Sequence, residues 1–439
     1  MNNQTLLNRS LQSVWHPCTQ MKQHETYPLI PIARGEGVWL YDADGKRYLD
    51  TVSSWWVNLF GHNNPRIKDA IKQQLDTLEH VMLAGFTHEP VVALSEKLAK
   101  LTGLGHAFYG SDGASATEIA LKMSFHYWRN LSSANQGKSN KTKFISLQNS
   151  YHGETLGALS VTDVAIFKDT YAPLLMQSAQ MPSPDFRLSE VGETAEEFAL
   201  RCAQAVESYV AAHHADLAAF IVEPLIQCAA GMGMYHPSYL RRIREICTQY
   251  EVHLIADEIA VGFGRSGTMF ACEQAEIKPD FICLSKGITG GYLPLSAVLT
   301  TDQVYQAFYD NSTVRGFLHS HSYTGNPLAC SAALATLAIF ETDNILQKNQ
   351  LKSQMIQAKM QVLTDLQIKH QRHQGMIFAF DVETQNAQFA KQCYQVAVQH
   401  DLLLRPIGNT VYWMPPYTIN EDEIDFMVNT THKVIKSIL

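Results

Sequence analysis

Residues 252–291 read VHLIADEIAVGFGRSGTMFACEQAEIKPDFICLSKGITGG. The stretch contains two short apolar runs, 252–256 and 281–284, which lead into charged side chains at Asp257 and Lys286. Short apolar runs bounded by glycine are typical of strands buried in an α/β sheet. Because ligands bind beyond the carboxyl ends of such strands, we expect Asp257 and Lys286 to face the same crevice.

A carboxylate and an amine at one strand edge suit chemistry with an aldehyde cofactor. A lysine forms a Schiff base with pyridoxal phosphate (PLP), and an aspartate holds a proton on the pyridine nitrogen, so that the ring accepts electrons. The structural alternative is a buried Asp257–Lys286 ion pair, or a lysine that is merely solvated. The other motifs of the chain favour the chemical interpretation.

The bulk properties exclude several classes of protein. A chain of 439 residues is too long to fold around one ordinary hydrophobic core, so we expect two or three sub-domains. The composition, 46% hydrophobic and 17% charged, is that of a soluble globular enzyme. A net charge of −8 gives no reason to expect nucleic acid or an anionic membrane as partner, and no run reaches the ~18 apolar residues of a membrane span. Eight singly placed cysteines and an N-terminus without a signal-peptide pattern favour the cytoplasm.

A turn of small residues, GSDGAS at 110–115, runs directly into a helical pattern. Backbone N–H groups at such a helix start form a phosphate cradle, although Ser, Asp and Gly also serve simply as caps. The strand pattern KFISLQ ends just before Tyr151, whose ring can stack on a cofactor ring, whereas the adjacent His152 is equally consistent with a structural role. Glu223 ends the buried pattern LAAFIV and suits either the site or a structural ion pair.

Near the N-terminus, Asp44-Gly45 predicts a hairpin between two aromatic-rich strands. The adjacent Trp55 and Trp56 would point to opposite sides of an extended segment, so that one could face a pocket while the other packs. Helical spacing of apolar residues predicts helices within three ranges, 65–101, 238–250 and 328–366. The tail from Gly375 contains two strand-like stretches, MIFAFDV and VYWMP, around a helix, which is typical of a small α+β domain.

Two further groups of polar residues are candidates for binding. Arg405 lies among apolar neighbours in LLLRPIGN, where its guanidinium could hold a carboxylate through two hydrogen bonds, and the alternative is an ordinary surface arginine. Ser320, Ser322 and Thr324 could donate to a phosphate. The pair His319-x-His321 lacks a third ligand, so we predict no metal site there.

The order of these motifs resembles the class III, fold-type I, PLP-dependent aminotransferases, and the resemblance covers essentially the whole chain, from WHPCTQM at 15–21 to YWMPPY. It implies an α/β fold: a large domain with a mostly parallel sheet between helices, plus a small α+β domain formed from both chain ends. The expected ranges are 1–62 for an N-terminal segment of the small domain, 63–327 for the large PLP-binding domain and 328–439 for the C-terminal small domain.

The resemblance also implies roles for single residues. Lys286 forms the Schiff base with PLP, and Asp257 pairs with the pyridinium nitrogen. Tyr151 stacks on the ring. The other implied residues contact the cofactor phosphate or the substrate: Gly113 and Ala114 at the phosphate, His321 and Ser322 reaching the phosphate in the neighbouring subunit of an obligatory homodimer, Trp55, Ser320 and Arg405 at the substrate, Trp56 and Tyr412 in the same pocket, and Arg265 as a second candidate for a carboxylate.

Within the class, SSWWVNLFGH, FGRSGTMFACE and RPIGNTVYWMPPY are most similar to the branch that serves biotin synthesis. That branch implies 8-amino-7-oxononanoate as amino acceptor and S-adenosylmethionine as expected donor, with lysine as the alternative donor. Cys18 stands where many members have a tyrosine of the substrate pocket, and Ser320-His321-Ser322 stands where Gly-Pro-Thr is more usual. The rival activities are a transaminase of 4-aminobutyrate, ornithine or ω-amines, and a PLP aminomutase; a non-catalytic protein on the same scaffold conflicts with the intact Asp257 and Lys286.

Overall fold

The computed structural model describes residues 2–27, 29–132 and 140–439. The chain forms two compact units. The first contains residues 1–65, 351–373 and 377–439, and the second contains residues 66–350 and 374–376. The first unit therefore takes its residues from both ends of the chain.

The second unit is built on a seven-stranded sheet with the order β4-β12-β11-β10-β7-β5-β6. Among the described residues, β12 alone runs antiparallel to the other strands of this sheet. Every residue of β7 and β10 is buried, which explains the continuous apolar runs in their sequences. The strands are β4 His106–Gly110, β5 Lys143–Leu147, β6 Ala179–Met181, β7 Leu217–Val222, β10 His253–Asp257, β11 Phe281–Leu284 and β12 Ser296–Thr300, and a separate pair is formed by β8 Ile226–Gln227 and β9 Gly233–Met234.

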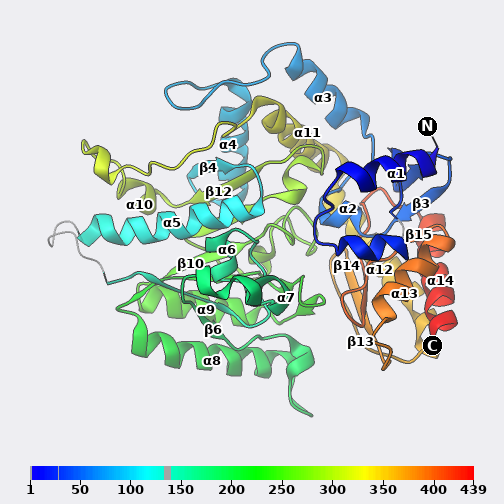
Figure 1. The fold of residues 1–439 in the computed structure, drawn as a ribbon. Helices are drawn as coiled ribbons and strands as arrows, with labels where there is room; N and C mark the ends of the chain where they lie inside the picture. Colours follow the sequence, from blue (N-terminus) through cyan, green and yellow to red (C-terminus); the bar gives the residue numbers. More distant parts are fainter. Residues whose placement is uncertain (1, 28, 133–139) are drawn as a thin grey trace. The chain divides into compact units, whose positions relative to one another are not determined.

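Helices pack on this sheet. Figure 1 shows α5, drawn in cyan, lying across the strands, and α8 and α9 running side by side. The apolar side of α5, including Ile119 and Met123, joins Ile255 and Phe281 of the strands in one buried cluster. The helices of the unit are α3 Pro65–Leu75, α4 Glu89–Thr102, α5 Gly113–Ser132, α6 Leu156–Ser160, α7 Ala165–Lys168, α8 Ala195–His213, α9 Ser238–Gln249, α10 Asp302–Gln306 and α11 Pro327–Asp343, with 3-10 turns η3 Asp169–Leu174, η4 Phe186–Leu188, η5 Ala271–Ala275, η6 Lys286–Thr289 and η7 Thr313–Arg315.

The first unit holds two smaller sheets. Three strands from the N-terminal region and β15 from the C-terminal region form the order β1-β2-β3-β15, and the C-terminal region alone forms β13-β14-β16. The predicted hairpin at Asp44-Gly45 is confirmed by the antiparallel pairing of β2 and β3. The strands are β1 Ile32–Glu36, β2 Trp39–Asp42, β3 Arg47–Asp50, β13 Ile368–Gln374, β14 Ile377–Val382, β15 Leu402–Leu403 and β16 Thr410–Trp413, and the helices are α1 Asn3–Ser13, η1 Met21–Glu25, α2 Ser53–Trp56, α13 Phe389–Gln399 and α14 Glu421–Ile438.

The long helical pattern predicted for 328–366 is broken. It is divided into α11, α12 Ile345–Lys359 and the 3-10 turn η8 Met360–Asp365. The break falls at Asn344, which adopts the left-handed conformation (φ 51°), and asparagine tolerates that conformation better than most residues. α11 packs against α4 and η6, so residues 328–350 belong to the second unit, whereas the expected ranges assigned them to the C-terminal small domain.

The helical pattern of 65–101 is also interrupted, because α3 ends at Leu75 and α4 begins only at Glu89. The amphipathic helix expected at 238–250 is confirmed as α9, which buries Tyr239, Leu240, Ile243, Ile246 and Cys247. Within the described residues, no single helix is long and apolar enough to cross a membrane. The segments Pro327–Asp343 and Ile345–Asp365 reach that length and hydropathy together, across a 73° bend.

The segment around Trp55 and Trp56 is not extended, and that expectation was wrong. Four consecutive residues, Ser53 to Trp56, have positive φ values of 49°, 47°, 70° and 74°. A left-handed backbone costs roughly 1–2 kcal/mol for each residue that carries a Cβ. The short helix α2 is therefore a left-handed turn whose strain must be balanced by specific contacts.

Candidate functional site

The carboxyl ends of the parallel strands in the second unit gather the predicted catalytic residues. β10 pairs in parallel with β11, so that Asp257 lies opposite Cys283. Lys286 follows three residues after Cys283, and it begins the 3-10 turn η6. Glu223 follows β7, which is the neighbour of β10, and Tyr151 follows β5, which lies next to β7 in the same sheet. Asp257 and Lys286 therefore lie at the carboxyl ends of two neighbouring strands, as the sequence predicted.

Lys286 has an unusual backbone and an unusual amine. Its φ of 47° lies in the left-handed region, where residues with a Cβ are uncommon and often functional. Ser285 anchors the turn by donating its hydroxyl to the carbonyl of Leu295 at 2.8 Å. Burial lowers the pKa of the Lys286 amine, and the charges of Asp257, Cys228 and Glu223 oppose that shift. A larger fraction of the amine is therefore neutral at physiological pH than for an ordinary lysine.

Asp257 is buried and held from two sides. Its Oδ2 lies 2.6 Å from Nδ1 of His152, and its Oδ1 accepts the N–H of Ile259 at 3.1 Å. The His152 side chain is fully buried, and its Nε2 makes no hydrogen bond within the described residues. Thr117 donates to the His152 carbonyl at 2.8 Å, and this bond ties the motif to α5. The carboxylate is thus fixed in one orientation by a histidine that the sequence treated as equally consistent with a structural role.

Tyr151 and Glu223 are linked to each other. The N–H of Tyr151 donates to Glu223 Oε2 at 3.0 Å, and the Tyr151 hydroxyl donates to Glu154 at 2.9 Å. Burial raises the pKa of Glu223 to about 7, while the neighbouring His152 lowers it in part. Glu223 therefore orders the backbone that carries Tyr151, and among the described residues it is a carboxyl that titrates near neutrality.

The start of α5 is a close-packed, small-residue corner. A Cβ on Gly113 would lie 3.0 Å from the side chain of Ile259, and a Cβ on Gly153 would lie 2.6 Å from that of Ala114. Gly153 also has φ +125°, which residues with a side chain rarely adopt. Asp112 caps the helix by accepting the N–H of Ser115 at 2.8 Å. The corner brings α5, the Tyr151 motif and the segment after Asp257 together, and they pack this closely because Gly113 and Gly153 carry no side chain.

The loop that follows η7 lies near the same corner. His321 Nδ1 is 3.4 Å from the hydroxyl of Ser111, and the Ser322 carbonyl is 2.7 Å from a ring nitrogen of His80. Ser320 and Ser322 are exposed. The loop therefore presents two exposed serine side chains on the surface of the second unit.

Arg265, the second candidate for a carboxylate, is buried in the second unit with 1% exposure. Its carbonyl accepts the N–H of Met376 at 2.9 Å. This position resembles a structural arginine more than an open binding group.

The remaining candidates lie in the first unit. Trp55 is 43% exposed, and the guanidinium carbon of Arg405 lies 4.4 Å from the centre of its ring. Both residues line a cavity of about 290 Å³. Trp56 and Tyr412 are buried, and the indole N–H donates to the tyrosine hydroxyl at 3.2 Å. The structure thus brings Trp55 to Arg405 and Trp56 to Tyr412, as two separate pairs.

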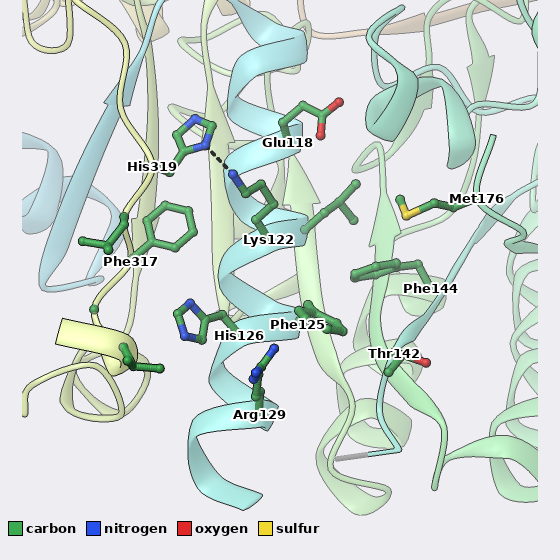
Figure 2. Close-up of a pocket in the computed structure, with 14 residues that line it drawn as sticks. Glu118, Lys122, Phe125, His126, Arg129, Thr142, Phe144, Met176, Phe317 and His319 are labelled. Carbon is green, nitrogen blue, oxygen red and sulfur yellow. Dashed lines mark hydrogen bonds between the residues drawn. The ribbon is translucent and has the colours of Figure 1, made fainter. Parts of the chain in front are cut away.

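A larger cavity, of about 570 Å³, lies along α5 of the second unit. Figure 2 shows Lys122, Phe125 and Arg129 projecting from α5, with Lys122 donating to His319 at 2.7 Å. Neither Asp257 nor Lys286 is among the residues that line it. Leu318 on its wall is 79% exposed, and the cavity is therefore an apolar surface groove next to the loop that carries His321.

Three comparisons with known proteins place this geometry in context. A family model described as "Aminotransferase class-III" matches residues 20–435. The chain is 47% identical over 430 residues to a protein of Helicobacter pylori named adenosylmethionine-8-amino-7-oxononanoate aminotransferase, and the match covers 94% of each chain.

Two solved structures are similar over nearly the full length. The adenosylmethionine-8-amino-7-oxononanoate aminotransferase of Methanocaldococcus jannaschii has a TM-score of 0.91 and 35% identity, covering 99% of both chains. An amine transaminase from an uncultivated Pseudomonas species, in a PLP-bound form, has a TM-score of 0.90 and 30% identity, covering 97% of this chain and 98% of the other. The fold predicted from the sequence is confirmed.

Proposed function

Because this chain belongs to the class III aminotransferases, we propose that it transfers an amino group to 8-amino-7-oxononanoate, which yields 7,8-diaminononanoate in biotin biosynthesis. The donor in this proposal is S-adenosylmethionine. The observation that carries the proposal is the 47% identity, spread over 94% of the chain, with the Helicobacter pylori protein of that activity. The intact Lys286 and Asp257 at adjacent strand ends support it.

PLP is the cofactor of this chemistry, and the residues of the second unit fit it. Lys286 would hold the aldehyde carbon, Asp257 the ring nitrogen and Tyr151 one face of the ring. The corner at Gly113 and Ala114 would accept the phosphate, because the backbone N–H groups at the start of α5 carry only small side chains there. When bound, PLP supplies a carbonyl that links to amines and a ring that accepts the electron pair released when a C–H bond breaks.

The protein side of the reaction is proton transfer by a positioned amine. Burial lowers the pKa of Lys286, so that its neutral form is available to take a proton from the donor carbon. The ammonium so formed can deliver a proton within the same half of the reaction, and in the second half the amine acts in the reverse sense, so that a proton reaches the acceptor carbon. Asp257 holds its carboxylate at a fixed place, since His152 and the N–H of Ile259 contact its two oxygens. A fixed carboxylate needs no reorganisation while charge develops nearby.

The first unit would supply recognition of the acceptor, which has an apolar chain ending in a carboxylate. Arg405 suits the carboxylate, and the face of Trp55 suits the chain. Trp56 and Tyr412 would support this pocket from behind, since both are buried. Ser320 remains a proposed substrate contact, and Arg265 remains a weaker candidate for a carboxylate because it is buried.

We also infer that the working form is a homodimer in the cytoplasm. Val314, Leu318 and Tyr323 are 78%, 79% and 66% exposed, and they flank the loop that carries His321 and Ser322. A second copy that covers this apolar surface would receive those two side chains at its cofactor phosphate.

The eight cysteines are all free thiols, which supports a reducing compartment.

The test is product formation by the purified, PLP-loaded protein. We expect 7,8-diaminononanoate, detected by mass spectrometry, when 8-amino-7-oxononanoate is supplied with S-adenosylmethionine. Formation with lysine alone would keep the reaction and change the donor. The second candidate, an amine transaminase activity, is favoured by the 0.90 TM-score of the Pseudomonas enzyme, and turnover of simple amines with no diaminononanoate would replace the main proposal. Turnover of a single substrate without any donor would instead indicate an aminomutase.

A further inference from the structure

The left-handed turn of Ser53 to Trp56 separates two neighbouring tryptophans. Trp55 is 43% exposed beside Arg405, whereas Trp56 is 5% exposed and donates to Tyr412. All four residues of the turn have positive φ values, so the two side chains are presented by a strained backbone. A strained turn that presents a binding residue requires a group that holds it in place.

Asp50 is that group. Its carboxylate is completely buried, and Oδ1 accepts the N–H groups of Val52 at 3.3 Å and Ser54 at 3.1 Å. Oδ2 accepts the Ser54 hydroxyl at 2.9 Å and lies 3.0 Å from Nε2 of His62. The other ring nitrogen of His62 is 3.1 Å from the amide of Asn58. One buried carboxylate therefore holds the entry to the turn and, through His62, the segment that follows it.

The flanks of the turn are tied to the C-terminal part of the same unit. The Ser53 hydroxyl donates to the Met414 carbonyl at 2.7 Å, and the Met414 N–H donates to the Thr51 carbonyl at 2.8 Å. The Thr51 hydroxyl donates to the Leu403 carbonyl at 2.5 Å. Leu403 lies two residues before Arg405, so the turn and the arginine are carried by one hydrogen-bonded framework.

Asp50, Ser54, Trp55 and Arg405 all line the cavity of about 290 Å³. The guanidinium carbon of Arg405 lies 4.4 Å from the centre of the Trp55 ring, which is within the range of a cation–π contact. Trp55 is therefore in position to hold the Arg405 guanidinium in one orientation.

We propose that Asp50 is a positioning residue for recognition of the acceptor's carboxylate: it fixes the left-handed turn, the turn fixes Trp55, and Trp55 fixes Arg405. This inference rests on the proposed function, in which Arg405 binds that carboxylate. Asp50 itself does not touch substrate in this assignment. It acts through the turn.

The first test compares 8-amino-7-oxononanoate with its uncharged carboxamide as acceptors. Asp50→Ala is expected to reduce the preference for the carboxylate about tenfold through a higher acceptor KM, while the rate of the donor half-reaction stays within about twofold. Asp50→Asn retains one acceptor oxygen for the N–H groups of Val52 and Ser54, so it should recover part of the preference. An unchanged preference in Asp50→Ala would overturn the proposal.

Asp42→Asn is the matched control. Asp42 is also a buried carboxylate of this unit, and it accepts the N–H groups of Asp44 and Lys46 in the β2–β3 hairpin. Its replacement should change stability and leave the carboxylate preference unchanged. An equal loss of preference in both variants would identify a general effect on folding and would also overturn the proposal.

A second readout does not depend on turnover. The protein is labelled with 5-fluorotryptophan, and the Trp55 resonance is assigned by its loss in Trp55→Phe. In Asp50→Ala the Trp55 resonance should shift or broaden, while that of Trp128 in the second unit stays in place. An unmoved Trp55 resonance contradicts the positioning role. If the wild-type protein used neither acceptor, the proposed function would fail, and the fluorine spectra would still decide whether Asp50 positions Trp55.

Discussion

Nδ1 of His152 lies 2.6 Å from Oδ2 of Asp257, and both side chains are buried. The distance is short for a nitrogen–oxygen hydrogen bond, as is typical of bonds to a carboxylate. Because His152 directly follows Tyr151, one short motif would place both the ring face and the support of the carboxylate. The pair connects the end of β5 with the end of β10, and it explains why Asp257 keeps one orientation in a buried site.

Replacing His152 removes that support. In His152→Phe a charged-group hydrogen bond worth about 1.5–3 kcal/mol is lost, so kcat should fall roughly 10- to 100-fold. Steady-state kinetics measure this, together with the pH dependence of the visible absorbance of the bound cofactor. His253→Gln serves as control, because His253 is also a buried histidine and contacts Ser124 instead. An equal loss of kcat in the two variants would show that His152 has no special role in catalysis.

Lys286→Ala should abolish the visible absorbance of the lysine-linked cofactor and lower kcat by at least 10²–10⁴-fold, the usual contribution of a general base. The control is Lys369→Ala, which removes an exposed lysine paired with Glu383 and should leave activity unchanged. Retention of most of the activity in Lys286→Ala would contradict the assignment.

The sequence predicts the fold well where the pattern has one physical solution. The apolar runs before Asp257 and Lys286 are buried strands, because leaving so many apolar side chains in water would cost the folded protein much free energy. The amphipathic pattern of α9 is equally direct. The left-handed turn at Trp55 could not be predicted, because Ser-Ser-Trp-Trp contains none of the glycines that normally mark positive φ.

The candidate site also contains residues that the sequence could predict and residues that it could not. Lys286, Asp257 and the small residues at Gly113 are recognisable by type and spacing. The roles of His152 and Asp50 depend on contacts with residues distant in the sequence or on a strained backbone, and neither leaves a periodic signal. The motif YHG gave a partial signal for His152, since the histidine adjoins a predicted ring-stacking residue.

Arg405 is predicted to bind the acceptor's carboxylate with both arms of its guanidinium. Arg405→Ala should raise the acceptor KM about 10- to 100-fold, because a charge-assisted pair contributes roughly 1.5–3 kcal/mol, and leave the donor half-reaction unchanged. Arg405→Lys should recover only part of the affinity, since lysine lacks the fork. Unchanged acceptor affinity in Arg405→Ala would refute the assignment.

His253 predicts a specific dependence of stability on pH. Burial lowers its pKa to about 4 in the folded state, so between pH 6.5 and 4 the unfolded chain binds more protons than the folded one. The stability that the neutral, buried His253 contributes to the folded state is therefore fully present above pH 6.5 and is lost as the pH falls toward 4. Urea unfolding of wild type and His253→Gln should show their difference in unfolding free energy shrinking by about 3 kcal/mol between pH 7 and pH 4. A constant difference would contradict the buried neutral histidine.

The groove along α5 predicts the contact between subunits. Leu318→Glu places a charge on an apolar surface that the proposed homodimer buries, so the dimer should dissociate and activity should fall with it. Leu200→Glu on α8, where Leu200 is 43% exposed, is the matched control and should stay dimeric. Analytical ultracentrifugation distinguishes the outcomes. If the Leu318→Glu variant stayed fully dimeric, the subunit interface would not include this surface.

The most direct test of the central claim is the donor half-reaction of the purified, PLP-loaded protein. S-Adenosylmethionine, lysine, glutamate and 4-aminobutyrate are added separately, and loss of the visible absorbance of the lysine-linked cofactor is followed. We predict that S-adenosylmethionine alone removes the absorbance and that 8-amino-7-oxononanoate restores it. Conversion only by glutamate or 4-aminobutyrate would contradict the account and assign the protein to the general transaminases.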